Sequence, residues 1–383
     1  MKTRIAIIGG GSQAHILAGF LGSQENVSIN ILTRRPKDWG KIFTTFDLSD
    51  KQYTAELGII SDKPEDVIPQ SDLIFFCLPG FAVKEQLIRI RPFVTNNHIL
   101  GSAFSGTGFF FDVLELFGAD VRCFGFQRVP FTGRVKEYGK SATLKGYKPF
   151  LAVAHLNCNE EYLAEQLSEL FKVEVRLLNN ILEATLSNSN PILHPSRLYV
   201  LYKDWYDQKL YDKEELFYEN WDDESSKLWI ACDGELQAIT QTFETPVNIE
   251  TVLSYYGCKD YRSLTTKLRS IKPFMGVKTP MIKVDNGFIL NGAYRYFTED
   301  IPYGLVIIKS IAEQTGIETP HINQLIEWGQ KVMHKEYIIN GKLTGKDISL
   351  SGYVNADVFQ MALCSVDKKL NLNRKKNDKR ATF

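Results

Sequence analysis

The sequence lacks the cysteine patterns that mark disulfide-rich, redox and metal-binding proteins. Its six cysteines, at positions 77, 123, 158, 232, 258 and 364, form no C-x-x-C pair and no spacing typical of metal ligands. We therefore expect free thiols in a reducing compartment and no bound metal. Cys77, inside the apolar run 73–78, is expected to be a small core residue.

Long apolar runs and an excess of either charge are also missing. No run approaches the roughly 18 apolar residues that span a membrane, and the chain reaches its first predicted strand at Ile5, which leaves no room for a signal peptide. The 45 basic residues balance the 45 acidic residues, so no net charge draws the protein to nucleic acid or to a membrane surface. We expect a cytoplasmic protein with no nucleic acid and no membrane as partner. The basic run 368–380 is expected to be a solvated tail.

The sequence does contain an alternation of predicted strands and helices, which ends near residue 180. Its 383 residues are enough for two domains with separate cores. Apolar runs such as 5–8 and 73–78 are typical of strands buried on both faces, the polar stretch 47–56 is expected to be a loop, and helical patterns dominate after residue 184. The sequence predicts an α/β fold, with a Rossmann-type doubly wound parallel sheet in residues 1–180 and an all-helical domain in residues 181–383.

A glycine motif follows the first predicted strand. Residues 9–14 read G-G-G-S-Q-A, which matches G-x-G-x-x-G/A, and helical spacing of apolar residues begins at Ile16. In this motif the first glycine permits a tight turn, the second lets the backbone approach a pyrophosphate, and N–H groups at the helix start face the phosphates. The motif predicts dinucleotide binding, and the alternative is a glycine turn in another strand–helix–strand unit. The predicted cofactor contacts here are Gly9, Gly11, Ser12, Gln13 and Ala14.

The end of the second predicted strand, residues 27–33, indicates which dinucleotide is bound. NAD-preferring sites place Asp or Glu there to hold the ribose hydroxyls, whereas this sequence has Thr33 followed by Arg34 and Arg35. Guanidinium groups pair with phosphate in a fixed fork, so we expect NADP(H) to be preferred and NAD(H) to be a second cofactor, unless the arginines form only a solvated turn. Leu78 and Pro79 are expected to line the nicotinamide end of the site, or else to form an ordinary strand-to-helix turn.

Two later stretches carry the residues that could perform chemistry. Residues 187–195 read S-N-S-N-P-I-L-H-P and contain Asn190 and His194; residues 294–304 read Y-R-Y-F-T-E-D-I-P-Y-G and contain Arg295 and Asp300. Histidine is the side chain whose ordinary pKa allows proton exchange near neutrality. The structural alternatives are a histidine satisfied in the core, an aspartate that caps a helix and an arginine that is only a surface charge.

Taken together, the motifs G-G-G-S-Q-A, N-P-I-L-H-P and R-Y-F-T-E-D-I-P-Y-G resemble the octopine/nopaline (opine) dehydrogenase family. The resemblance extends from the first strand to about residue 320, and the two later motifs are more specific than the glycine motif. It implies an NAD(P)H-dependent enzyme that joins an amino group to a 2-oxo acid and reduces the imine that forms. It also implies a nicotinamide that faces a cleft between the domains, where closure excludes water.

The resemblance assigns roles residue by residue. His194 gives or takes a proton, Asp300 orients the imidazole and stabilises its protonated form, and Arg295 clamps a substrate carboxylate. Asn190 helps to position the substrate, and Arg134, in F-T-G-R-V-K, resembles a family arginine near the cleft by a looser match. Residues 127–131 depart from the L-P-W form of several members, which leaves the size of the substrate pocket open.

The expected partners are small molecules, a 2-oxo acid and an amino acid, whose identity the sequence does not give. The oligomeric state is left open, with a homodimer as one arrangement. Two other functions remain as alternatives: a simple 2-oxo or 3-hydroxy acid reductase with the same two-domain plan, since fold does not fix function, and a non-catalytic NADPH-binding protein.

Overall fold

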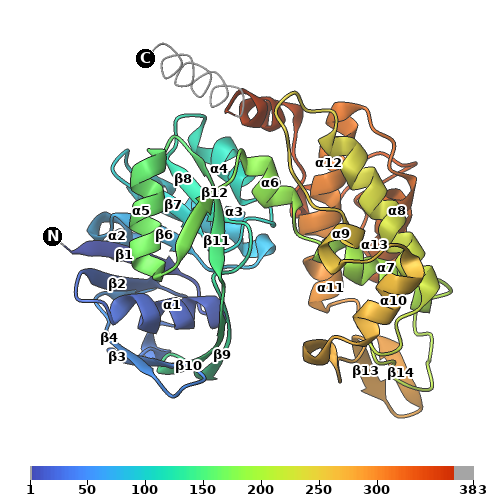
Figure 1. Ribbon diagram of the computed structural model, residues 1–383, viewed down its shortest axis with the longest axis horizontal. Coiled ribbons are helices and arrows are strands. Elements are labelled where there is room, and N and C mark those ends of the chain that lie inside the picture. Colours follow the sequence, from blue (N-terminus) through green and yellow to red (C-terminus); the bar gives the residue numbers. More distant parts are fainter. Residues whose placement is uncertain (1, 366–383) are drawn as a thin grey trace. The chain divides into compact units, whose positions relative to one another are not determined.

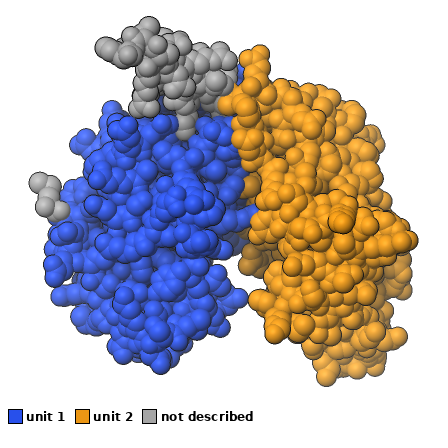
Figure 2. Space-filling view, viewed as in Figure 1, with its two compact units in different colours: residues 1–185, 360–383 blue, residues 186–359 orange. Residues whose placement is uncertain are grey.

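A computed structural model describes residues 2–365 and places them in two units (Figures 1 and 2). The first unit comprises the described residues up to Thr185 together with 360–365, and the second comprises Leu186–Phe359. Among the described residues the division follows Thr185, close to the boundary expected at residue 180, and residues 360–365 belong to the first unit. The basic run 368–380 lies outside the described residues.

The first unit is built on an eight-stranded sheet with the strand order β12-β11-β8-β7-β6-β1-β2-β5. All neighbouring strands are parallel except one pair, β8 with β11, which is antiparallel. This arrangement confirms the predicted Rossmann-type sheet. The chain order reverses between β1 and β6, and sheets of this kind bind ligands at the carboxyl ends of the strands beside that reversal. The strands are β1 (Thr3–Ile8), β2 (Val27–Leu32), β5 (Ile60–Ser61), β6 (Leu73–Phe76), β7 (Ile99–Ser102), β8 (Cys123–Phe126), β11 (Phe150–Leu156) and β12 (Glu174–Leu177).

Helices cover both faces of this sheet, which explains its continuous apolar strands. Successive side chains of a strand point to opposite faces: in β6, Phe75 contacts Phe171 of α5 with ring centroids 6.0 Å apart, and Phe76 contacts Phe109 of α4 at 5.6 Å. Helices α1 and α5 share one core on the Phe75 face (Figure 1). The helices of this unit are α1 (Ser12–Gly22), α2 (Pro64–Val67), α3 (Gly80–Ile90), α4 (Phe109–Phe117) and α5 (Glu160–Phe171), and α6 (Ile181–Leu186) lies at the division.

A second sheet, with the order β4-β3-β10-β9, also packs against α1 and was not predicted from the sequence. Every residue of α1 from Ala14 to Leu21 is buried as a result. The stretch 47–56, expected to be a loop, contains strand β4. Strand β3 pairs in parallel with β10, which lies almost a hundred residues further along, so no local sequence pattern marks this sheet. Its strands are β3 (Ile42–Phe46), β4 (Gln52–Glu56), β9 (Phe131–Glu137) and β10 (Ser141–Tyr147).

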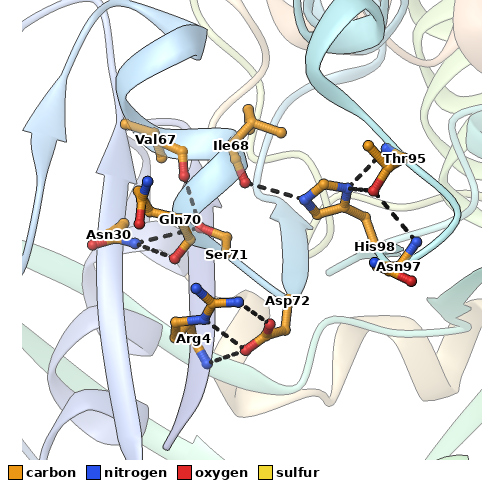
Figure 3. Close-up of polar contacts among 10 residues, drawn as sticks. All are labelled: Arg4, Asn30, Val67, Ile68, Gln70, Ser71, Asp72, Thr95, Asn97 and His98. Carbon is orange, nitrogen blue, oxygen red and sulfur yellow. Dashed lines mark hydrogen bonds and ion pairs between the residues drawn. The ribbon is translucent and has the colours of Figure 1, made fainter.

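Polar contacts fasten the segments that lead into β6 and β7 (Figure 3). Asp72 accepts from the backbone N–H, Nε and Nη2 of Arg4 at 3.0, 3.1 and 2.5 Å, and the amide of Asn30 donates to the Ser71 hydroxyl at 3.3 Å. The His98 ring accepts a backbone N–H at Nδ1 and donates from Nε2 to a backbone carbonyl. The amino ends of β1, β6 and β7 are thus held by side chains.

The second unit is helical, as predicted, but it also carries one two-stranded hairpin, β13 (Met281–Val284) with β14 (Gly287–Leu290). Its core is rich in aromatic side chains, among them the fully buried Phe217, Trp221 and Trp229. No helix in residues 2–365 has the length and apolarity needed to cross a bilayer. The helices are α7 (Asn190–Tyr202), α8 (Asp223–Thr240), α9 (Val252–Tyr256), α10 (Tyr261–Arg269), α11 (Arg295–Thr298), the π-helical turn η5 (Ile301–Leu305), α12 (Val306–Thr315) and α13 (Pro320–Val332).

Candidate functional site

The glycine loop between β1 and α1 has a backbone that fits a dinucleotide. Gly9 has a φ of +130°, and a Cβ there would lie 2.6 Å from the Cys77 carbonyl oxygen, so only glycine suits this position. At Gly11 no atom lies within 4 Å of the place a Cβ would take. Helix α1 begins at Ser12, and the first N–H groups of a helix have no partner within it. An open approach and a helix N-terminus are what a pyrophosphate requires.

Two further residues of the motif lie inside the structure. Ala14 is fully buried, which allows close packing of α1 on the sheet. Gln13 donates from Nε2 to the Phe131 carbonyl at 2.7 Å. The other amide atom, Oε1, is buried and has no hydrogen-bond partner among the described residues, so a bound group could still satisfy it.

His15, in the first turn of α1, ties the glycine loop to the turn between β9 and β10. Its Nδ1 donates to the Gly11 carbonyl at 3.0 Å, and its Nε2 accepts from the Gly139 N–H at 2.8 Å. Because a backbone N–H can only donate, Nε2 carries no proton and the imidazole is neutral. The ring is fully buried beside Trp39 and Tyr138, with centroids 4.4 and 4.9 Å away, and this burial lowers the pKa of His15.

The end of β2 is followed by a threonine hydroxyl and by two arginines, one of which is paired within the described residues and one of which is not. Thr33 is buried, and its Oγ1 accepts from the Arg35 N–H at 3.4 Å. The guanidinium of Arg35 lies 4.2 Å from the ring centroid of Tyr138 and donates from Nε to Asp38 at 2.5 Å. Arg34 is exposed, and its side chain has no partner within residues 2–365. Arg34 is therefore the arginine that can bind an anion without breaking a contact.

Leu78 and Pro79 follow the carboxyl end of β6, next to the glycine loop. A Cβ at Gly9 would lie 3.3 Å from Cδ2 of Leu78, and Pro79 is exposed immediately before α3. Both residues thus lie beside the point where the strand order reverses. Their contact with the nicotinamide remains a prediction.

The second unit holds His194 and Asp300 in direct contact. Nδ1 of His194 lies 2.7 Å from Oδ2 of Asp300, and the two residues are 5% and 3% exposed. An ionised carboxylate can only accept, so the proton of the neutral imidazole lies on Nδ1. Its other nitrogen, Nε2, is 3.3 Å from the Tyr218 hydroxyl. The structure therefore brings together two residues that lie 106 positions apart in the sequence.

Close packing between the two sequence motifs produces this contact. His194 lies on α7, and Asp300 immediately precedes the π turn η5, whose backbone packs against α7. A Cβ at Gly304 in η5 would lie 2.3 Å from Cγ of Pro191, so only a glycine lets η5 approach α7 this closely. Pro191 is accommodated because the first turn of a helix needs no N–H from it. The two sequence motifs, N-P-I-L-H and E-D-I-P-Y-G, thus pack directly against each other.

Aromatic side chains surround the imidazole. Tyr296 stacks on it with centroids 3.8 Å apart and an interplanar angle of 21°, and Phe217 contacts it edge-on at 5.6 Å. Burial raises the pKa of Tyr296 to about 12 and raises the pKa of Tyr218 further, while the positive charge of Arg295 opposes both shifts. Both phenols therefore keep their protons at neutral pH and can donate hydrogen bonds.

Asn190 and Arg295 lie near this cluster. Asn190 is one helical turn before His194 on α7, so their side chains share a face of the helix. Arg295, the first residue of α11, is exposed and its guanidinium has no partner in the described part of the chain. Both side chains are available to a ligand.

Arg134 does not belong to this cluster. It lies on β9, in the second sheet of the first unit, where it is exposed and donates from Nη1 to the Gly133 carbonyl at 2.9 Å. Its proposed role near substrate remains a prediction.

Sequence reasoning missed His15, Tyr138, Tyr218 and Tyr296. A histidine among the apolar residues of α1 was a usable signal. Tyr218 had none, because it lies in the irregular segment before α8. That segment is held by the buried Arg197, one turn after His194, which donates to the Phe217 carbonyl at 3.2 Å.

A Rossmann-type sheet with a glycine loop, together with a buried imidazole–carboxylate pair in a helical unit, defines a nicotinamide-dependent dehydrogenase. Comparison with known proteins gives the family. Residues 177–333 match the model of the α-helical domain of NAD/NADP octopine/nopaline dehydrogenases. Tauropine dehydrogenase of Arabella iricolor is 30% identical, over 90% of this chain and 95% of the relative.

Solved structures agree with this match. Octopine dehydrogenase with NADH and pyruvate has a TM-score of 0.84 at 25% identity, covering 94% of this chain and 98% of the other. The same enzyme with NADH and L-arginine has a TM-score of 0.83 at 26% identity, covering 92% and 94%. The chain therefore belongs to the octopine/nopaline (opine) dehydrogenase family and is an oxidoreductase that uses a nicotinamide cofactor.

We predict that His15 makes the folded protein less stable as the pH falls below about 6.5. The pKa of His15 is lowered in the folded state from its ordinary value of 6.5, so below that pH the unfolded chain binds a proton that the folded chain does not. The free energy of unfolding then decreases by at most about 1.4 kcal/mol per pH unit, until the pH reaches the lowered value. Urea unfolding of the wild type and His15→Gln between pH 7.5 and 5, a range set around that ordinary value, should show a steeper loss in the wild type; equal slopes would contradict the prediction.

Proposed function

We propose that this enzyme joins an amino acid, or another amine, to a 2-oxo acid and reduces the imine to a secondary amine dicarboxylate. In balance, the amine, the oxo acid, NAD(P)H and a proton give the secondary amine, NAD(P)+ and water. The observation that carries the proposal is the buried pair of His194 and Asp300, in a chain whose solved relative binds NADH with pyruvate and with L-arginine.

In this proposal His194 moves a proton at Nε2. Loss of water from the carbinolamine requires a proton on the departing oxygen, and an imidazole that has first taken up a proton at Nε2 can deliver it. Asp300 fixes the ring through Nδ1 and stabilises the protonated imidazole. When bound, the reduced nicotinamide supplies the hydride that the imine carbon accepts.

The neighbouring groups suit the two carboxylates and the amine of such substrates. The guanidinium of Arg295 is unpaired within residues 2–365 and can hold a carboxylate with two parallel hydrogen bonds. Asn190 offers an amide on the face of α7 that bears His194, and the Tyr218 hydroxyl already lies within 3.3 Å of Nε2. Arg134 is kept as a further candidate carboxylate ligand.

We also propose that NADP(H) is preferred over NAD(H), although the solved relative was captured with NADH. Thr33 offers a hydroxyl where an acidic residue would repel a 2'-phosphate, and the Arg34 side chain has no competing partner among the described residues. Arg35, already paired with Asp38, is the weaker candidate of the two arginines. The six free cysteines support the proposed cytoplasmic location.

The alternatives differ from this proposal in what they require for turnover. A simple 2-oxo or 3-hydroxy acid reductase needs no amine, and a non-catalytic protein binds NADPH without oxidising it. We predict that a matrix of 2-oxo acids against amino acids, followed by NAD(P)H absorbance, will show oxidation only in wells that contain both substrates. Oxidation of NAD(P)H at the same rate with an oxo acid alone would show that the enzyme is a simple reductase. Binding of NAD(P)H without turnover in every well would indicate a non-catalytic protein.

We predict that Arg34→Ala raises the KM for NADPH by about 10- to 100-fold and leaves the KM for NADH within a few-fold. The lost interaction is a hydrogen bond between charged groups, which contributes about 1.5–3 kcal/mol. Arg35→Ala should raise the KM for NADPH less than Arg34→Ala does, and the double variant should raise it more than either single variant. Arg176→Ala, at an exposed arginine of β12 paired with Glu174, is the matched control. Equal changes in both KM values for Arg34→Ala would remove the assigned preference.

A further inference from the structure

The first unit contains a cavity that lies away from the glycine loop. It has a volume of about 360 Å³. Its lining residues come from the last turn of α1, the end of α5 and the strands β4, β9, β10 and β11 or the residues beside them, and Figure 1 shows where these elements lie. Residues Ser23 and Gln24, just after α1, line it. The glycine loop precedes the opposite end of α1, about 15 Å away at 1.5 Å per residue. None of the predicted cofactor residues lines this cavity.

The walls are aromatic, and we call the cavity the aromatic pocket, after Phe20, Tyr53, Phe131, Tyr147 and Phe171. Phe20 lies 5.0 Å from Tyr53 and 4.7 Å from Phe131, and Phe131 lies 5.9 Å from Phe171, all between ring centroids. Phe20, Phe131 and Phe171 pack against one another and are only 2–4% exposed, whereas Tyr147 is 51% exposed and leaves the most aromatic surface for an apolar group. The volume falls in the usual range for small-molecule sites.

The hydroxyl groups of Tyr53 and Tyr147 both donate hydrogen bonds within the protein. The Tyr147 hydroxyl donates to Asp47 at 3.0 Å, so the Tyr53 hydroxyl, 2.8 Å from that of Tyr147, donates to Tyr147. Neither phenol therefore has a proton left for a ligand. Asp47 also accepts from the Ser49 hydroxyl at 2.7 Å, so this carboxylate is already engaged in hydrogen bonds within the protein.

The rim of the pocket is positively charged. Lys51, Lys148 and Lys172 line it, and no acidic side chain is among the lining residues. No ion pair joins these three lysines to a carboxylate within residues 2–365, whereas basic and acidic residues balance over the whole chain. Lys51 lies 4.8 Å from the ring centroid of Tyr53. A ligand with one or more negative charges above an aromatic body would complement this arrangement.

We propose that the aromatic pocket binds a small aromatic carboxylate, with its ring against the aromatic wall and its carboxylate at the three lysines. This site differs from the dehydrogenase site in its lining residues and in its ligand. A single aromatic carboxylate suits it better than an extended partner, because a volume of about 360 Å³ is that of a small-molecule site and the charged residues among the described lining are the three lysines.

The test is isothermal titration of the full-length protein with naphthoate and with uncharged naphthalenemethanol. Naphthoate should bind saturably, more tightly than the alcohol and more weakly at high salt, since exposed charges are screened. The triple variant Lys51→Gln/Lys148→Gln/Lys172→Gln should bind naphthoate at least about tenfold more weakly. The reason is that it loses three exposed ion pairs between a lysine and the carboxylate, each of modest strength. Lys145→Gln, an exposed lysine of β10 outside the lining, is the matched control and should bind like the wild type.

Two further measurements separate this pocket from other places where naphthoate could bind. Saturating NADPH and the Arg295→Ala variant should both leave naphthoate affinity within twofold, and circular dichroism should show that the triple variant is folded. No saturable binding, equal affinity in the triple variant, or competition by NADPH would overturn the proposal. A dimer of the wild type that dissociates in the triple variant would also overturn it, since a second copy of the chain would then occupy the pocket.

Discussion

The hydrogen bond between His194 Nδ1 and Asp300 Oδ2 is the contact on which this account of the enzyme depends. It is 2.7 Å long, is buried from solvent, and joins two motifs 106 residues apart. It determines which nitrogen carries the proton, and so leaves Nε2 to act on other groups. The stacked Tyr296 and the Tyr218 hydroxyl confine the ring further. Without the carboxylate, a buried protonated imidazole would be poorly stabilised.

In each unit a buried imidazole beside a candidate binding element connects two segments that are distant in sequence. In the first unit His15 joins the glycine loop to the turn at Gly139, and in the second His194 joins α7 to the turn at Asp300. The difference lies in the partners. Two backbone groups hold the His15 ring in its neutral form and burial lowers its pKa, which suits a structural role, whereas His194 has a carboxylate at Nδ1 and a hydroxyl near Nε2.

The sequence was sufficient wherever the determining interactions are local. The first strand, the glycine loop and α1 follow each other directly, and the apolar run that contains β6 is continuous because both its faces are covered. The second sheet was not predictable in this way, since β3 finds its partner β10 almost a hundred residues away. The pairing of His194 with Asp300 came from family resemblance, and the packing of Gly304 on Pro191 that produces it is visible only in the structure. Tyr218 was missed because an irregular segment places it.

The most direct test of this account is the turnover number of the His194→Ala and Asp300→Asn variants at saturating substrate and cofactor. The account predicts a loss of about 100- to 10,000-fold in each, with the Kd for NAD(P)H unchanged because the cofactor loop belongs to the other unit. A far-ultraviolet spectrum like that of the wild type would show that the variants are folded. Turnover within a few-fold of the wild type in either folded variant would contradict the central role of this hydrogen bond.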